Sequence, residues 1–175
     1  LEGVVVAETR LSDVDGERGR LILRGKTVEE LAPTATFEEV CALFLDVDAA
    51  TARAELGAAR VKASAALRDD AGGIGAVVGF RAHGAERAQA GRGDVMEALR
   101  VALAFPGGED PWEAIGLAAV ALASFARGHV VDADATRSHA EDLLRMLGGD
   151  SSPPLVRALD TYLVTVSDHG LNAST

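Results

Sequence analysis

Helix-start signals recur along most of this chain and constrain its fold more than any other feature of the sequence. Thr27 and Thr36 are each followed three residues later by glutamate, the capping-box pattern that closes the first turn of a helix. Asp110 precedes Pro111, and proline favours the first helical position. Three further segments have similar starts, at Asp94, Ser138 and Ser152. The chain is therefore expected to be mainly helical.

The apolar residues after these starts indicate how the helices pack. Residues 114–126 are apolar on nearly every side, which predicts a central helix surrounded by others. Residues 50–67 can form one helix. The apolar side chains of the last helical stretch follow the i, i+4, i+7 spacing of one face, which we expect to be buried. They are Leu155, Leu159, Tyr162, Leu163 and Val166.

The strand signals lie at the start of the chain. Two branched-aliphatic runs, residues 4–9 and 20–24, flank an Asp-Gly turn at residues 13–19, which predicts a small hairpin. An aromatic content of only 4%, with abundant alanine, favours closely packed helices over a sheet core. We therefore predict an all-α, multi-helical bundle with an N-terminal β-hairpin segment, residues 1–25, and a helical domain, residues 26–175.

The charge of the chain excludes several classes of partner. A net charge of −10 argues against nucleic acid, because phosphate binding needs an excess of lysine and arginine. The longest apolar stretch, residues 114–126, is shorter than the roughly 20 residues that a bilayer span needs. The first residues lack the basic start and apolar run of a secretory signal. We expect a cytoplasmic protein that binds neither nucleic acid nor membrane.

The residues that could bind metal or act as nucleophiles lack the required spacing. Cys41 is the one cysteine, which excludes an internal disulfide, and we expect it to be a small buried apolar residue. The four histidines have no metal-ligand spacing, and Ser167 lacks the glycines of a nucleophile elbow. The glycine-rich residues 72–79 lack the Gly-Lys-Ser/Thr of a phosphate loop. We expect no metal and no bound cofactor.

A polar cluster follows the last apolar helical stretch. Residues 168–175 read Asp-His-Gly-Leu-Asn-Ala-Ser-Thr. The structural interpretation is that His169 interacts with the last carbonyls of the helix and that Asp168 and Asn172 form turns. The functional interpretation is an anion site, because an imidazole and an amide at a helix end can donate hydrogen bonds to a dicarboxylate.

The whole octapeptide resembles the (Asp/Glu)-His-Gly-(Leu/Met)-Asn-Ala-Ser-Thr segment of bacterial and archaeal citrate synthases. Upstream segments resemble the same family in register: residues 1–5 with Thr9 and Ser12, 15–25, 28–32, 36–40, 138–144 and 158–166. The resemblance covers nearly the whole chain and is weakest over residues 45–93. Two departures stand out. Lys26 occupies a position where the family often has tyrosine, and residues 57–93 differ from the usual helix pair.

This resemblance implies the N-terminal half of the large helical domain of an acyltransferase of the tricarboxylic acid cycle. The family condenses acetyl-CoA, here a cosubstrate, with oxaloacetate to give citrate. The resemblance maps His169 and Asn172 onto the oxaloacetate site. It places the catalytic aspartate, the other histidines and the clamping arginines beyond Thr175. No catalytic residue is therefore expected in this chain, and the isolated chain is predicted to be inactive.

The partners implied are a dicarboxylate such as oxaloacetate and either a second copy of the chain, in a homodimer, or a complementary C-terminal half. A divergent paralogue or a 2-methylcitrate synthase-like enzyme, using propionyl-CoA, fits the same residues. The alternative is a non-catalytic helical module derived from that fold, which binds a protein partner or an acidic metabolite.

Overall fold

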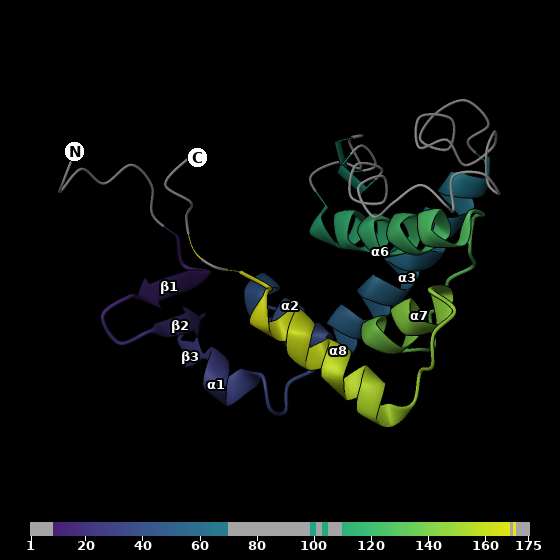
Figure 1. The fold of residues 1–175 in the computed structure, drawn as a ribbon. Helices are drawn as coiled ribbons and strands as arrows, with labels where there is room; N and C mark the ends of the chain where they lie inside the picture. The colour runs from purple at the N-terminus through teal and green to yellow at the C-terminus, as the bar shows by residue number, and fades with distance from the viewer. Residues whose placement is uncertain (1–8, 70–98, 101–102, 105–109, 169, 171–175) are drawn as a thin grey trace.

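The computed structural model describes residues 9–69, 99–100, 103–104, 110–168 and 170. These residues form six helices and a small three-stranded antiparallel sheet, so the predicted mainly helical fold class is confirmed. The sheet and α1 lie at one end, α2 and α8 run side by side, and α3, α6 and α7 form the rest of the bundle (Figure 1). Several predicted features lie outside the described residues: the helix start at Asp94, the glycine-rich residues 72–79, His169 and Asn172.

The sheet differs from the predicted hairpin. Its strands are β1 (Ser12–Asp15), β2 (Arg20–Leu23) and β3 (Lys26–Thr27), in the order β1-β2-β3. The prediction of residues 4–9 as the partner strand was wrong in register, because β1 occupies part of the expected turn and pairs with β2. The turn needs only residues 16–19, and Asp15 Oδ1 accepts a hydrogen bond from the Arg18 amide at 3.0 Å within it.

The predicted helix starts are confirmed wherever the chain is described. Both capping boxes form, at α1 (Val28–Leu31) and α2 (Phe37–Leu45). Asp110 Oδ1 accepts from the Trp112 amide at 2.9 Å and caps α6 (Pro111–Arg127). Ser138 accepts from the Glu141 amide at the start of α7 (His139–Met146). α8 (Pro153–Thr165) follows Ser152, whose side chain makes no capping hydrogen bond.

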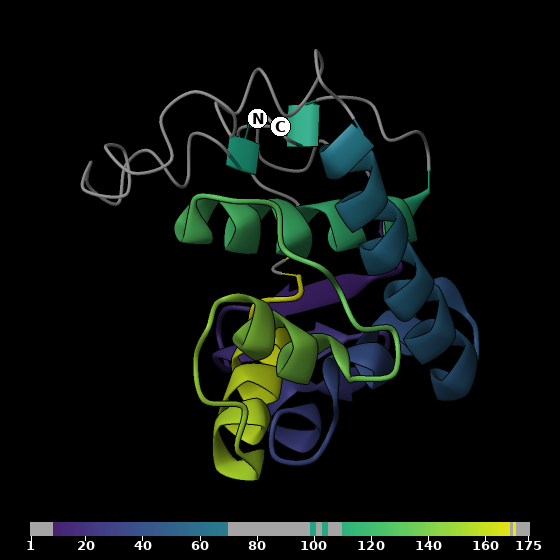
Figure 2. The same cartoon turned by 90° about the vertical axis from the view of Figure 1, so that its right-hand side faces the viewer.

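The long helix α3 (Ala49–Asp69) packs against α6, and Figure 2 shows the two helices crossing. Small residues form the contact. A Cβ added to Gly116 of α6 would lie 2.6 Å from the carbonyl carbon of Ala59, so the two backbones touch. Every residue from Ile115 to Phe125 is buried or half-buried, which confirms the central position predicted for this helix. Among the described residues, no helix is both long and apolar enough to cross a membrane.

The predicted buried face of α8 is only partly buried. Leu159 and Leu163 are half-buried, whereas the prediction was wrong for the other three residues. Leu155, Tyr162 and Val166 are 45%, 61% and 53% exposed. The buried face instead carries polar groups that bond to α1, α2 and the loop between them. Arg157 donates to the carbonyl of Ala35 at 2.8 Å, and Asp160 Oδ1 accepts from the amide of Phe37 at 3.0 Å. These hydrogen bonds hold the helix in an orientation that leaves Leu155, Tyr162 and Val166 exposed.

Candidate functional site

The C-terminal end of α8 carries the candidate anion-binding segment. Ser167 Oγ donates to the carbonyl of Val164 at 2.9 Å and satisfies one of the carbonyls that the end of the helix leaves free. The amide of Gly170 then donates to Asp168 Oδ1 at 3.0 Å, which closes a tight turn after the helix. Asp168 and Gly170 thereby fix the backbone on both sides of position 169.

This turn lies against the sheet. Gly170 has a φ of +79°, where residues with a side chain are strained. A Cβ at Gly170 would also lie 3.3 Å from Val14 Cγ2 and 3.8 Å from Ser12 Oγ. Ser12 Oγ is buried and has no hydrogen-bond partner among the described residues. The glycine therefore permits both the turn and its close approach to β1.

The sequence predicted His169 and Asn172 as the oxaloacetate-binding residues, and both lie outside the described residues. The structure describes the two neighbours of His169, which are Asp168 and Gly170. Asp168 and Gly170 lie after the end of α8, and a Cβ added at Gly170 would lie 3.3 Å from Val14 of β1.

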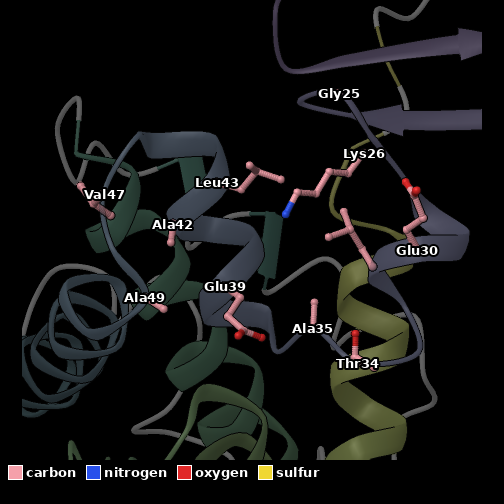
Figure 3. Close-up of a pocket in the computed structure, with 11 residues that line it drawn as sticks. Gly25, Lys26, Glu30, Thr34, Ala35, Glu39, Ala42, Leu43, Val47 and Ala49 are labelled. Carbon is pink, nitrogen blue, oxygen red and sulfur yellow. The ribbon is translucent and has the colours of Figure 1, made fainter.

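A second candidate site is a pocket of about 780 Å³ between the β2–β3 turn, α1 and α2 (Figure 3). Lys26 extends its ammonium group toward the hollow. The lining residues are Gly25, Lys26, Glu30, Leu31, Thr34, Ala35, Glu39, Ala42, Leu43, Val47 and Ala49. Sequence reasoning singled out Lys26 as a departure from the family pattern but did not predict a pocket.

The charges of this pocket are unequally engaged. Glu30 and Glu39 are committed to the capping boxes of α1 and α2, where they accept from the amides of Thr27 and Thr36 at 2.8 and 2.7 Å. The hydrogen bonds from Thr27 lower the pKa of Glu30. Lys26, in contrast, forms no ion pair with any described residue. The pocket therefore holds the Lys26 ammonium group beside apolar side chains and the two capping carboxylates, and the charge of Lys26 helps to lower the pKa of Glu30.

A buried polar cluster that sequence reasoning missed joins α3 to α7. Arg60 Nε donates to Asp142 Oδ2 at 2.9 Å, and Arg60 Nη1 lies 3.3 Å from His139 Nδ1. Glu38 Oε1 accepts from the amide of His139 at 2.6 Å. Burial, reinforced by the charge of Arg60, lowers the pKa of His139 to about 3. Because all four side chains are closed to solvent, this cluster orients helices and is no candidate for substrate chemistry.

Cys41 is buried in α2, as predicted, and burial raises the pKa of its thiol to about 12. Within residues 9–69 and 110–168, no three histidine, cysteine, aspartate or glutamate side chains are grouped as a metal ion would require.

Comparison with protein families decides the membership of the chain. A sequence model described as "Citrate synthase, C-terminal domain" matches residues 1–175. The chain belongs to the citrate synthase family. Its position within the family's full-length sequence as an N-terminal half stays a prediction.

Curated citrate synthases from Deinococcus radiodurans and Haloferax volcanii are 32% and 33% identical to the chain over 196 and 190 aligned residues. The matches cover all of this chain but only 49% and 50% of those two citrate synthases. The chain therefore spans about half the length of the curated relatives that it matches.

Solved structures of the family share the fold. The citrate synthase of Thermotoga maritima superposes with a TM-score of 0.66 at 22% identity, covering 98% of this chain and 47% of that one. The citrate synthase of Thermoplasma acidophilum gives 0.68 at 21% identity, covering 98% and 48%. The latter is a ternary complex with carboxymethyl coenzyme A and oxaloacetate. At this identity the likeness establishes the fold of the citrate synthase family for the described helices.

Proposed function

We propose that this chain is one half of a citrate synthase-type acyltransferase and that it contributes the oxaloacetate-binding segment. In this proposal His169 and Asn172 donate hydrogen bonds to oxaloacetate, and acetyl-CoA is the cosubstrate. The chain carries no catalytic residue of its own. It acts in the cytoplasm, as a homodimer or together with a complementary C-terminal half.

The observation that carries the proposal is the anchored turn at the end of α8. The Asp-His-Gly-Leu-Asn-Ala-Ser-Thr segment begins there, and a Cβ added at Gly170 would lie 3.3 Å from Val14 Cγ2 on β1. A fixed backbone on both sides of an imidazole is what substrate positioning requires, because small displacements of a binding group weaken catalysis strongly. The family match over residues 1–175 supports the same assignment.

We expect the isolated chain to be catalytically inactive. Condensation needs a general base for the methyl proton of acetyl-CoA and donors that stabilise the developing enolate. We place these groups in the half of the family sequence that the chain does not match. The buried His139 cannot replace them, because it is 3% exposed and its ring packs against Phe37 and lies beside the Arg60 guanidinium.

Mixing the halves tests this function. The chain is assayed for thiol release from acetyl-CoA and oxaloacetate, alone and with the half of the D. radiodurans citrate synthase that lies outside the match. We expect no release by the chain alone and release by the mixture. Two matched halves of the D. radiodurans enzyme serve as the positive control for assembly. Thiol release by the chain alone, or a folded mixture without activity, would contradict the proposal.

The pocket at Lys26 favours a second candidate, a metabolite-binding module. Lys26 has no ion pair with a described residue, and the apolar side chains of Leu31 and Leu43 line the same hollow. This combination suits a small carboxylate with an apolar body. Isovalerate is a suitable probe in calorimetric titration. Binding that Lys26→Met abolishes supports the module, and undetectable binding to the wild-type chain excludes it.

A further inference from the structure

The pocket at Lys26 is lined by charged groups of both signs. Glu30 and Glu39 line it together with Lys26, and each glutamate uses one carboxylate oxygen, Oε2, to accept from its capping threonine. In both side chains the other oxygen, Oε1, accepts no hydrogen bond from any described residue. An ionised carboxylate can accept several hydrogen bonds, so both glutamates keep acceptor capacity after capping their helices.

Two residues in the left-handed conformation fix the rim of this pocket. Arg24 has a φ of 49° and Asp46 a φ of 55°, values that are uncommon for residues with a side chain. Arg24 Nη2 donates to Asp46 Oδ2 at 2.5 Å, and Arg24 Nε donates to the carbonyl of Leu43 at 3.2 Å. These bonds hold the β2–β3 turn against the end of α2, and both elements line the pocket. Residues held in strained conformations cluster at binding sites, where they keep the site preformed.

The polar groups of the pocket come from different elements and stand among aliphatic side chains. Lys26 belongs to β3 and extends its ammonium group toward α2, whose first turn carries Glu39 (Figure 3). The large apolar side chains of the lining are Leu31, Leu43 and Val47. A few polar groups on an apolar wall are typical of sites for small molecules. A donor and an acceptor beside aliphatic walls match a ligand that has a carboxylate, an ammonium group and an aliphatic body.

We propose that the pocket binds a zwitterionic amino acid with an aliphatic side chain. Lys26 donates to the carboxylate of the ligand, and Glu39 Oε1 accepts from its ammonium group. This assignment rests on the second proposed function, the metabolite-binding module, and names the class of its ligand. A simple carboxylate would pair with Lys26 but would be repelled by the two glutamates of the lining. A zwitterion has no net charge and gains a charge-assisted hydrogen bond at each end.

Calorimetric titration with L-valine and isovalerate tests the proposal, because the two molecules differ only in the ammonium group. The wild-type chain should bind valine about tenfold more tightly, the contribution of one hydrogen bond to a charged group. Glu39→Gln should reduce this preference to less than about threefold, although glutamine still completes the capping box of α2. Glu29→Gln is the matched control, since Glu29 is exposed, lies in the first turn of α1 and does not line the pocket. It should leave both affinities within about twofold.

Three results would overturn the amino-acid site. Equal affinities of the wild-type chain for valine and isovalerate would show that the ammonium group is not recognised, and they would leave the carboxylate-binding module intact. A preference for valine that Glu39→Gln leaves unchanged would place the acceptor on another residue. Undetectable binding of both ligands would exclude the module and the amino-acid site together. Thiol release by the mixed halves is measured separately, so none of these results decides whether the chain is half of an acyltransferase.

Discussion

Arg60 and Asp142 form an ion pair whose two side chains are almost completely buried, with Arg60 Nε 2.9 Å from Asp142 Oδ2. The pair joins the middle of α3 to α7 across 82 residues of sequence. Asp142 also accepts from the amide of Asp134 at 3.0 Å, and Arg60 donates to the carbonyl of Arg137 at 3.1 Å. The buried pair thus helps to attach the loop before α7 to both helices. Ala133, which donates to Ser64 Oγ, and Thr136, whose carbonyl accepts from Arg53, add further links to α3.

Neutralising Asp142 should therefore destabilise the fold strongly. Asp142→Asn leaves the Arg60 guanidinium buried without its counter-charge, and breaking such pairs costs about 3–5 kcal/mol. The measurement is the free energy of unfolding in urea. Arg18→Gln, in the exposed Arg18–Asp15 pair, is the control and should change that free energy by less than about 1 kcal/mol. Equal effects of the two substitutions would show that the buried pair has no special weight.

The contact between α3 and α6 should not tolerate a methyl group. In a helix interior, Gly→Ala ordinarily stabilises by roughly 0.5–1 kcal/mol. At Gly116 the added Cβ would meet the backbone of Ala59 at 2.6 Å, and overpacking of this kind costs about 1–3 kcal/mol. Gly116→Ala should therefore lower the free energy of unfolding. Gly16→Ala, where no atom lies within 4 Å, should leave it nearly unchanged. Stabilisation by Gly116→Ala would contradict the close crossing.

His139 should make the stability of the fold dependent on pH. Burial, and then the charge of Arg60, lowers its pKa from 6.5 to about 3 in the folded chain, so the unfolded chain takes up the extra proton between these values. Stability contributed by the neutral imidazole is complete above pH 6.5 and is lost as the pH falls toward 3. The expected slope is at most about 1.4 kcal/mol per pH unit.

Comparing wild-type chain with His139→Gln isolates this contribution, because the carboxylates titrate in both proteins. Urea unfolding is measured at several pH values from 7 to 4. The difference in free energy of unfolding between wild type and variant should shrink as the pH falls below 6.5. Parallel curves over this range would show that His139 titrates alike in the folded and unfolded chains.

Cys41 should be unreactive in the folded chain. Burial first, and then the nearby charge of Glu38, raises the pKa of its thiol to about 12, and the thiolate is the nucleophilic form. An aromatic disulfide reagent at pH 8 should modify it only after unfolding in urea. The free thiol in denaturant serves as the control. Rapid modification without denaturant would mean that α2 opens readily.

The sequence predicted the local features of the fold well and the long-range ones poorly. The capping boxes at Thr27 and Thr36 involve residues three positions apart, so their pattern is visible in the sequence. The pair of Arg60 and Asp142 depends on the packing of α3 against α7, which no local spacing reveals. The predicted hairpin pairs residues 4–9 with residues 20–24. In the structure the turn at residues 16–19 is short, so residues 12–15 pair with β2 instead.

The error on α8 has a different physical cause. The spacing of the apolar residues places them on one side of the helix but does not show how far that side is covered. Leu159 and Leu163 are half-buried, whereas Leu155, Tyr162 and Val166 are exposed. In the described structure the helix contacts α1, α2 and the loop between them through its polar side, which forms hydrogen bonds with Ala32, Ala35 and Phe37. For the candidate site, the motif predicted His169 and Asn172, whereas the approach of the Gly170 backbone to Val14 depends on tertiary packing that no local pattern reveals.

The most direct test of the central claim is the oxaloacetate dependence of thiol release in the mixture of the two halves, with His169→Ala compared with His129→Ala. His129 is exposed in the loop after α6 and far along the chain from the segment, so its loss controls for removal of an imidazole. If His169 donates to oxaloacetate, His169→Ala should lower kcat/KM for oxaloacetate by about a hundredfold, the loss of one charge-assisted hydrogen bond. His129→Ala should leave it within twofold. Equal values of kcat/KM for the two variants would contradict the assignment of residues 168–175 to the oxaloacetate site.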